Sequence, residues 1–339
     1  MKHINIALFV VHKGCPNMCS FCNQRSISGS SADVTPDDVH QAARTAMASL
    51  SGEQAKGGEI AFFGGSFTMV AREYMISLLE AAYSYVEKGI FKGIRISTRP
   101  DGINREICEI LKKYGVTAVE LGAQSLDDKV LELNSRGHTA EQVEQACAML
   151  KEYGFGTGLQ MMTGLYGSDD ADSIETARRI IALAPDTVRI YPTVVLKGTA
   201  LYDFMLEGKF TPKGIEETVE LCSKLIPMFE DAGIKVIRVG LHSGGGVEES
   251  FAGGAYHPAM RELCEGRIFY NAALEKLEKL GQGEYVLAVN PHNVSRMTGQ
   301  KKENLIKLQS LGYRCIVKAN ADIEGNEIKV RYSDDIKIT

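Results

Sequence analysis

Three of the eight cysteines of this 339-residue chain lie within eight residues, as Cys15, Cys19 and Cys22 in a C-x3-C-x2-C run. Thiolates at this spacing on one loop can converge on a single metal centre. Structural zinc takes four ligands, and no second cysteine pair or histidine pair follows at a matching spacing. A [4Fe–4S] cluster normally takes four cysteines, so three would leave one iron open for a substrate or cofactor. The spacing therefore favours an open [4Fe–4S] cluster, with a zinc site completed by His12 or a distant residue as the alternative.

The elements that must position these cysteines are short apolar runs that alternate with longer amphipathic stretches. The runs are nearly continuous, as is typical of strands buried on both faces of a parallel sheet. They span residues 4–11, 59–63, 93–98, 118–122, 158–162 and 187–194. Helices are predicted over 35–50, 72–87, 105–114, 140–153 and 173–184, then over 213–232 before a further strand at 235–239. This alternation predicts an α/β fold of six β/α units, either a doubly wound sheet or an incomplete barrel.

In both arrangements the chemistry belongs at the carboxyl ends of the strands. Glycine and polar residues gather at those ends without having been used to define the strands. They are Gly64, Gly65 and Ser66 after the second run, Ser97 at the third, Gln124 after the fourth and Gln160 within the fifth. We therefore expect them to lie near the cysteines.

The cysteine run resembles the cluster loop of the radical S-adenosylmethionine (SAM) superfamily, including an aromatic residue, Phe21, just before Cys22. The resemblance implies a partial (β/α)6 TIM-like barrel whose [4Fe–4S] cluster binds the methionine end of SAM. Reductive cleavage would yield a 5′-deoxyadenosyl radical that abstracts hydrogen, with the electron supplied by a flavodoxin- or ferredoxin-type donor. The stretch from Gly64 through Gly65 and Ser66 looks like the superfamily's glycine motif, where the backbone approaches the methionine amino group.

Gln124 and Arg136 resemble the pair that contacts ribose and the methionine carboxylate in oxygen-independent coproporphyrinogen oxidase. An arginine suits a carboxylate because its planar guanidinium can donate two parallel hydrogen bonds. The alternative for Arg136 is a surface salt bridge. Ser97 and Gln160 fall where that enzyme has polar cofactor contacts, although both are neutral rather than acidic here.

Stretches between residues 60 and 240 resemble the radical domain of the catalytic subunit of Elongator, a tRNA-modifying enzyme. They are residues 94–101, 120–125, 136–139 and 190–199. Two departures limit the resemblance: the gap between the first two cluster cysteines is short here, and no acetyltransferase domain is recognisable after the barrel. The resemblance implies RNA or tRNA as a substrate, without carrying over the wobble-uridine chemistry.

A glycine-rich stretch separates the predicted barrel, residues 1–245, from a C-terminal α+β domain, residues 246–339. Residues 289–304 resemble a KH module, in which a glycine-centred turn between two helices clamps the nucleic-acid backbone. Gly299, Lys301 and Lys302 would form that turn, although Lys302 replaces the second glycine of the KH pattern. The alternative is a helical cap on the barrel with a solvated lysine pair.

Composition sets further bounds. The net charge of −5 gives no global nucleic-acid signature, although a local basic patch remains compatible with it. The chain has neither an apolar run long enough to cross a membrane nor a recognisable signal peptide, so we expect a cytoplasmic protein without membrane contact. Two further hypotheses stay open: the same radical chemistry on a small molecule or peptide, and a non-catalytic metal- or RNA-binding module.

Overall fold

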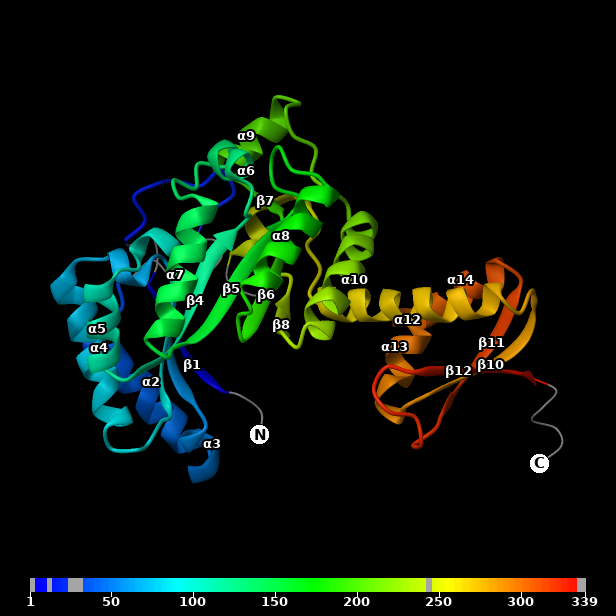
Figure 1. Ribbon diagram of the computed structural model, residues 1–339, viewed down its shortest axis with the longest axis horizontal. Helices are drawn as coiled ribbons and strands as arrows, with labels where there is room; N and C mark the ends of the chain where they lie inside the picture. Colours follow the sequence, from blue (N-terminus) through cyan, green and yellow to red (C-terminus); the bar gives the residue numbers. More distant parts are fainter. Residues whose placement is uncertain (1–3, 11–13, 24–32, 242–245, 334–339) are drawn as a thin grey trace. The chain divides into compact units, whose positions relative to one another are not determined.

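The computed structural model describes residues 4–10, 14–23, 33–241 and 246–333 (Figure 1). The chain divides into two compact units. The first unit comprises Met1–Gly214 and Met228–Tyr256, and the second comprises Ile215–Pro227 and His257–Thr339. No helix among the described residues is long and apolar enough to cross a membrane.

A curved sheet of seven parallel strands forms the first unit, in the order β1-β2-β3-β4-β5-β6-β8. This confirms the predicted α/β partial barrel. The strands are β1 (Asn5–Val10), β2 (Glu59–Gly64), β3 (Gly93–Thr98), β4 (Val116–Gln124), β5 (Gly156–Thr163), β6 (Thr187–Pro192) and β8 (Lys235–Val239). Side chains alternate between the two faces of each strand, so apolar residues such as Ile94 and Ile96 are fully buried on one face of β3 while Arg95 lies on the other.

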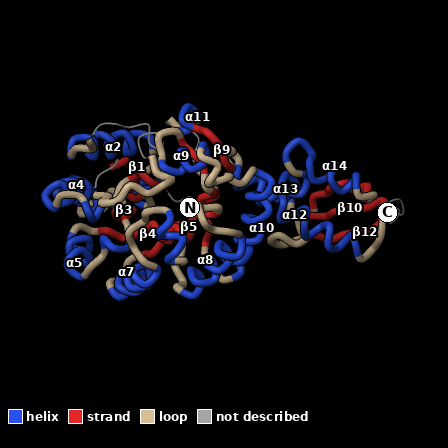
Figure 2. Tube along the Cα trace, turned by 90° about the horizontal axis from the view of Figure 1, so that it is seen from above, coloured by secondary structure: helices blue, strands red, loops and turns tan. Residues whose placement is uncertain are grey.

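Helices cover the outside of this curved sheet, as Figure 2 shows for α2, α4, α5, α7 and α8. The helices of this unit are α2 (Pro36–Ser49), α3 (Gly52–Lys56), α4 (Arg72–Val86), α5 (Arg105–Lys113), α6 (Asp128–Leu133), α7 (Ala140–Glu152), α8 (Asp170–Ala182), α9 (Ala200–Leu206) and α11 (Val247–Ser250). Helix α10 (Ile215–Asp231) begins in the second unit and ends in the first. The predicted start of α2 is confirmed, because Thr35 and Asp38 form a reciprocal capping box with Pro36 in the first turn.

Two details of the first unit differ from the sequence prediction. The strand predicted over 187–194 ends at Pro192, and residues Val194–Leu196 form a separate strand, β7, that pairs antiparallel with β9 (Phe251–Gly254). This pairing ties residues beyond 245 to the first unit. The division between units after Tyr256 therefore lies later than the boundary predicted at residue 245, which itself falls outside the described residues.

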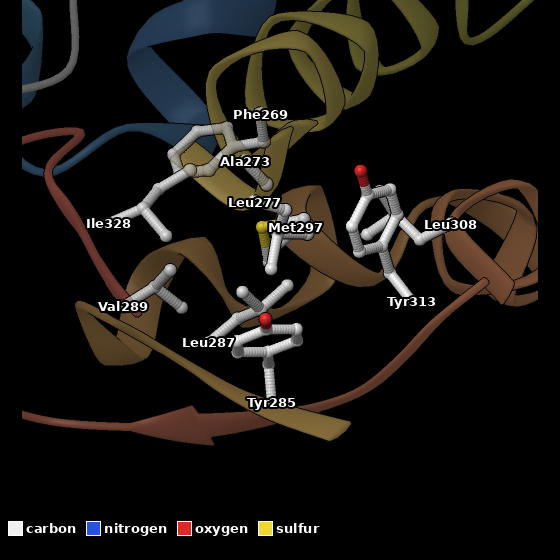
Figure 3. Close-up of a cluster of buried hydrophobic side chains, with 10 residues drawn as sticks. All are labelled: Phe269, Ala273, Leu277, Tyr285, Leu287, Val289, Met297, Leu308, Tyr313 and Ile328. Atoms are coloured by element: carbon white, nitrogen blue, oxygen red, sulfur yellow. The ribbon is translucent and has the colours of Figure 1, made fainter. Parts of the chain in front are cut away.

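The second unit has three strands and three α-helices of its own. They are α12 (Met260–Glu278), β10 (Gly283–Val289), α13 (Val294–Thr298), α14 (Glu303–Ser310), β11 (Tyr313–Ala319) and β12 (Ile328–Tyr332). The sheet order is β11-β10-β12, with β10 parallel to β11 and antiparallel to β12. Figure 3 shows its core, where Tyr285, Leu287 and Val289 of the central strand meet apolar residues of all three helices. The helices thus bury one face of the sheet.

Candidate active site

The loop that carries the three cysteines is held by segments far away in the sequence. Ser20 bonds Asn134 twice: its amide donates to the Asn134 carbonyl (3.1 Å) and its hydroxyl to Asn134 Oδ1 (2.7 Å). The Ser20 carbonyl accepts from the amide of Leu201 at 2.7 Å. Because Asn134 is fully buried and also donates to the carbonyls of Val130 and Tyr166, it fixes the cysteine loop to two other loops of the barrel.

The cysteines differ in exposure. Cys19 is buried, whereas Cys15 and Cys22 are half-buried, and no disulfide involves any of them. Burial raises the pKa of the Cys15 thiol and the neighbouring Cys19 adds to this, while the charges of Arg99 and Arg136 oppose it. As placed in the described residues, no three histidine, cysteine or acidic side chains converge closely enough to hold a metal ion. His12, the fourth ligand of the alternative zinc site, lies outside the described residues.

The glycine motif lies next to the cysteine loop. Gly64 ends β2 with a φ of 107°, and a Cβ there would stand 3.0 Å from the carbonyl oxygen of Val10. The amide of Gly65 donates to that same carbonyl at 2.6 Å. Gly14, just before Cys15, has a φ of 73°, and a Cβ on it would lie 2.2 Å from the carbonyl oxygen of Ser66. Side chains at positions 14 and 64 would therefore push the motif and the loop apart.

The structure brings Arg136, Gln124 and Gln160 together at the carboxyl ends of β4 and β5. Arg136 is 6% exposed, and its Nη1 donates to Cys19 Sγ at 3.1 Å while Nη2 donates to the Gly122 carbonyl at 2.7 Å. Gln124 has a left-handed φ of 67°, and its Oε1 accepts from Gln160 Nε2 at 3.1 Å. Arg136 is therefore not in a surface salt bridge, and its guanidinium points at a predicted cluster ligand.

Sequence reasoning named Ser66 but missed the two buried threonine hydroxyl groups, of Thr68 and Thr98, that lie beside it. Thr98 Oγ1 lies 2.9 Å from Ser66 Oγ and 2.7 Å from Thr68 Oγ1. Ser66 Oγ also accepts from the Arg99 amide at 3.2 Å, and the Arg99 guanidinium makes a bidentate pair with Asp101. The alternation at the end of β3 could have indicated Thr98 rather than Ser97. Ser97 itself is half-buried, and its register partner on β4 is Glu120.

His138 lies beside this set, between the end of β4 and helix α7. Its Nε2 contacts the Ala123 carbonyl at 3.2 Å, which favours a proton on that nitrogen. Burial, together with the positive charges of Arg136 and Arg99, lowers the pKa of His138 to about 4. At neutral pH, His138 is thus an uncharged ring whose Nδ1 is a free acceptor.

Three buried nitrogen atoms near the cysteines have no hydrogen-bond partner within the described residues. They are Arg99 Nη1, Arg136 Nε and His138 Nδ1. Because a buried polar atom without a partner costs free energy, their grouping indicates a site that receives a polar ligand. Of the other predicted site residues, Phe21 is half-buried on the cysteine loop. Gly299, Lys301 and Lys302 belong to the second unit.

A chain of ion pairs crosses the inner face of the barrel. Arg95 Nε lies 2.8 Å from Glu59, and Arg95 Nη1 lies 3.2 Å from Glu120. Arg189 Nη2 donates to the same Glu120 carboxylate at 2.8 Å. The four side chains come from β2, β3, β4 and β6, so the chain of charges ties strands together beneath the candidate site.

Comparisons with known proteins bear on what this site does. A model of the radical SAM superfamily matches residues 9–180, and a model of the radical SAM C-terminal domain matches residues 185–269. The chain belongs to the radical SAM superfamily.

Curated relatives of this radical SAM protein include tRNA-modifying enzymes. A tRNA uridine(34) acetyltransferase from Dehalococcoides mccartyi is 37% identical over 123 residues, which is 35% of this chain and 27% of the relative. Elongator complex protein 3 from Homo sapiens is 30% identical over 190 residues, which is 50% of this chain and 35% of the relative. The chain thus spans about a third or less of the length of these relatives.

A solved structure shares the fold. The archaeal Elp3 of Methanocaldococcus infernus, lacking residues 1–46, aligns with a TM-score of 0.63 and 22% identity, covering 81% of this chain and 63% of that one. The chain therefore shares the partial-barrel fold of this Elp3 structure.

The site fits the cofactors that the family implies, a [4Fe–4S] cluster and SAM. Cys15, Cys19 and Cys22 would supply the three thiolates, and within the described residues Arg136 keeps an unpartnered Nε beside them that can donate to a carboxylate. Gly64 lets the end of β2 approach the Val10 backbone closely, where a side chain would intrude, and so keeps the glycine motif next to the cysteine loop. The donor set, the free buried nitrogens and the glycine cradle thus suit a thiolate-bound cluster with an amino-acid ligand.

Proposed function

We propose that this radical SAM enzyme modifies RNA, with tRNA as the first candidate substrate. The tRNA-modifying relatives support the substrate class, and the observation that carries the proposal is a rigid basic turn in the second unit. This turn, Gly299–Lys302, joins α13 to α14 and exposes both Lys301 and Lys302. A turn of this kind between two helices is how KH modules clamp a nucleic-acid backbone.

The turn is held in one conformation. Asn304 is 6% exposed, and its Nδ2 donates to the carbonyls of Gly266 (2.8 Å), Arg296 (3.1 Å) and Met297 (3.1 Å). Gly299 has a φ of 75°, and a Cβ on it would lie 3.0 Å from Asn304. Lys301 and Lys302 both have left-handed backbones, with φ of 49° and 65°, so Lys302 adopts a conformation that glycine favours at the position where the KH pattern has its second glycine.

Within the first unit, each group has a defined task. The three cysteines would hold the cluster, Arg136 would bind and orient the methionine carboxylate, and Gly64 would lie where the family's glycine motif admits the amino group. When bound, the cluster and SAM supply a 5′-deoxyadenosyl radical that abstracts hydrogen from the substrate. Buried neutral His138 accepts a hydrogen bond without adding charge to the site. One electron per cleavage comes from a reduced flavodoxin- or ferredoxin-type donor.

The test is an anaerobic reconstitution with iron and sulfide, followed by a reductant, SAM and total tRNA. We expect tRNA to stimulate 5′-deoxyadenosine formation and to gain a nucleoside of changed mass, and we expect Cys19→Ala to abolish both. Deoxyadenosine formation that RNA does not affect, without a changed nucleoside, would overturn the RNA assignment and favour a small-molecule or peptide substrate. A protein that retains zinc and forms no deoxyadenosine would instead support the non-catalytic module.

A further inference from the structure

The three-stranded sheet of the second unit has a face that its own helices do not cover. All three helices contribute to the core on the face of Tyr285, Leu287 and Val289. Residues on the opposite face, called here the outer face, alternate with those core residues. The outer face comprises Glu284, Val286 and Ala288 of β10, Arg314, Ile316 and Lys318 of β11, and Lys329 and Arg331 of β12.

Strand register gathers the basic residues of the outer face. Lys318 and Lys329 flank Ala288 on its two sides, and Ile316 and Arg331 flank Val286 in the next row. All three of these basic side chains are exposed. Lys318 and Lys329 lie on either side of β10, two strand spacings or about 10 Å apart, so their long side chains can both reach one stretch of a phosphate backbone.

The charge of the outer face is almost entirely positive. Its one carboxylate, Glu284, pairs with Arg314 at 3.1 Å, and both are more than 60% exposed, so solvent screens the pair. Lys318, Lys329 and Arg331 have no carboxylate partner among the described residues. Residues 283–333 hold eight Lys and Arg against five Asp and Glu, a net charge of +3 in a chain of net charge −5. Such a local concentration of positive charge complements a polyanion.

A groove continues the outer face towards the basic turn. It has a volume of about 390 Å³ and lies between α14 and β11, lined among others by Lys302, Ile306, Arg314 and Ile316. Ile306 and Ile316 are 60% and 50% exposed, which leaves an apolar surface between the basic ends. An unpaired base can place its ring on such a surface, whereas a duplex hides its bases.

We propose that the outer face and this groove together bind single-stranded RNA, with Lys318, Lys329 and Arg331 on the phosphates. The inference deepens the proposed function, on which the choice of RNA as the polyanion rests. It places the RNA contacts beyond the Gly299–Lys302 turn, on a sheet surface that the sequence resemblance did not indicate.

The test measures binding of a fluorescein-labelled uridine dodecamer to the full chain by fluorescence polarisation between 50 and 300 mM salt. Lys318→Ala with Lys329→Ala is expected to weaken binding about tenfold and to reduce the log–log salt slope by about 1.4, because each contact with a single strand contributes about 0.7. Lys276→Ala with Lys279→Ala is the matched control: it removes two exposed lysines, one in the last turn of α12 and one at its C-cap, from the same unit and should bind like the wild type. Far-UV circular dichroism checks that both variants fold.

Three results would overturn the inference. They are equal affinity and slope for the two double variants, tighter binding of a duplex than of the single strand, and tighter binding of a glutamate-rich peptide, which would assign the face to an acidic protein. The binding assay needs no turnover, so it separates the two proposals. If RNA stimulates deoxyadenosine formation but the Lys318 and Lys329 variant binds RNA like the wild type, only the assignment of the outer face as an RNA-binding surface is refuted. If the Lys318 and Lys329 variant binds RNA more weakly but RNA does not stimulate turnover, only the proposed function is refuted.

Discussion

Replacing His138 with glutamine should remove much of the acid sensitivity of the barrel. His138 is 5% exposed, and burial together with the charges of Arg136 and Arg99 lowers its pKa to about 4 from an ordinary value of 6.5. The unfolded chain therefore binds more protons than the folded chain between these two values. The stability that the folded chain gains by keeping His138 neutral is fully present above about pH 6.5, and it is lost progressively as the pH falls towards 4.

The size of the effect follows from proton linkage. At pH 5 the unfolded histidine is almost fully protonated while the folded one is mostly neutral, which corresponds to a loss of about 2 kcal/mol relative to pH 7.5. Glutamine does not titrate, and its side-chain amide can donate to the Ala123 carbonyl in place of Nε2. The variant should therefore lose about 2 kcal/mol less than the wild type over this range.

Urea unfolding at pH 7.5 and pH 5 measures this difference. The chain has no tryptophan, so far-UV circular dichroism is the appropriate signal. The exposed His292→Gln variant controls for the removal of a histidine as such. If the wild type and His138→Gln lose equal free energy between the two pH values, His138 is not a buried neutral ring and the description of its surroundings is wrong.

Four other changes test the site and its supports. Arg136→Ala should weaken SAM binding at least tenfold in equilibrium titrations while the iron content stays unchanged, and equal affinity would place the carboxylate contact elsewhere. Glu120→Gln should destabilise the barrel by about 3 kcal/mol, because the half-buried Arg189 loses its carboxylate partner and Arg95 loses one of its two carboxylates, whereas Glu152→Gln in an exposed pair should cost less than about 1 kcal/mol. Asn134→Ala should reduce the iron retained after gel filtration, because the cysteine loop loses its anchor; full retention would contradict this. Gly299→Ala should cost about 1–3 kcal/mol in urea unfolding, since its backbone lies in a region that only glycine occupies readily, and an unchanged midpoint would argue against a fixed turn.

The sequence predicted best the features that depend on the residue pattern of a single strand. The apolar runs predicted six of the seven parallel strands, and the seventh, Lys235–Val239, was predicted with its exact bounds. The polar residues at the strand ends were predicted to meet, and Gln124 and Gln160 do so at 3.1 Å. Parallel strands with buried faces leave little freedom in register, so the position of a residue along the chain fixes its height in the barrel.

Features that depend on pairing between residues far apart in the sequence could not be predicted from the pattern of one segment. Strand β7 exists because β9, more than fifty residues later, supplies its hydrogen-bond partner. The inner ion pairs join Glu59 to Arg95 and Arg95 to Glu120, and each of these residues is a single charge within an apolar run. Only the register between strands shows that their charges compensate one another.

The placement of charge in the barrel explains how a polar site can sit above a strand core. Glu120 lies two positions before Gly122 on β4, so the paired charges occupy the level directly below the Gly122 carbonyl that holds Arg136. Each cation at the lower level has a carboxylate partner, whereas the Arg136 guanidinium at the upper level bonds, among the described residues, a thiol sulfur and a carbonyl oxygen but no carboxylate. Because the charges at the lower level compensate one another, they do not attract an anion further into the barrel. The uncompensated guanidinium beside Cys19 is therefore the position in this part of the barrel where an incoming carboxylate would gain most, which supports the proposal that the ligand binds at the cysteine loop.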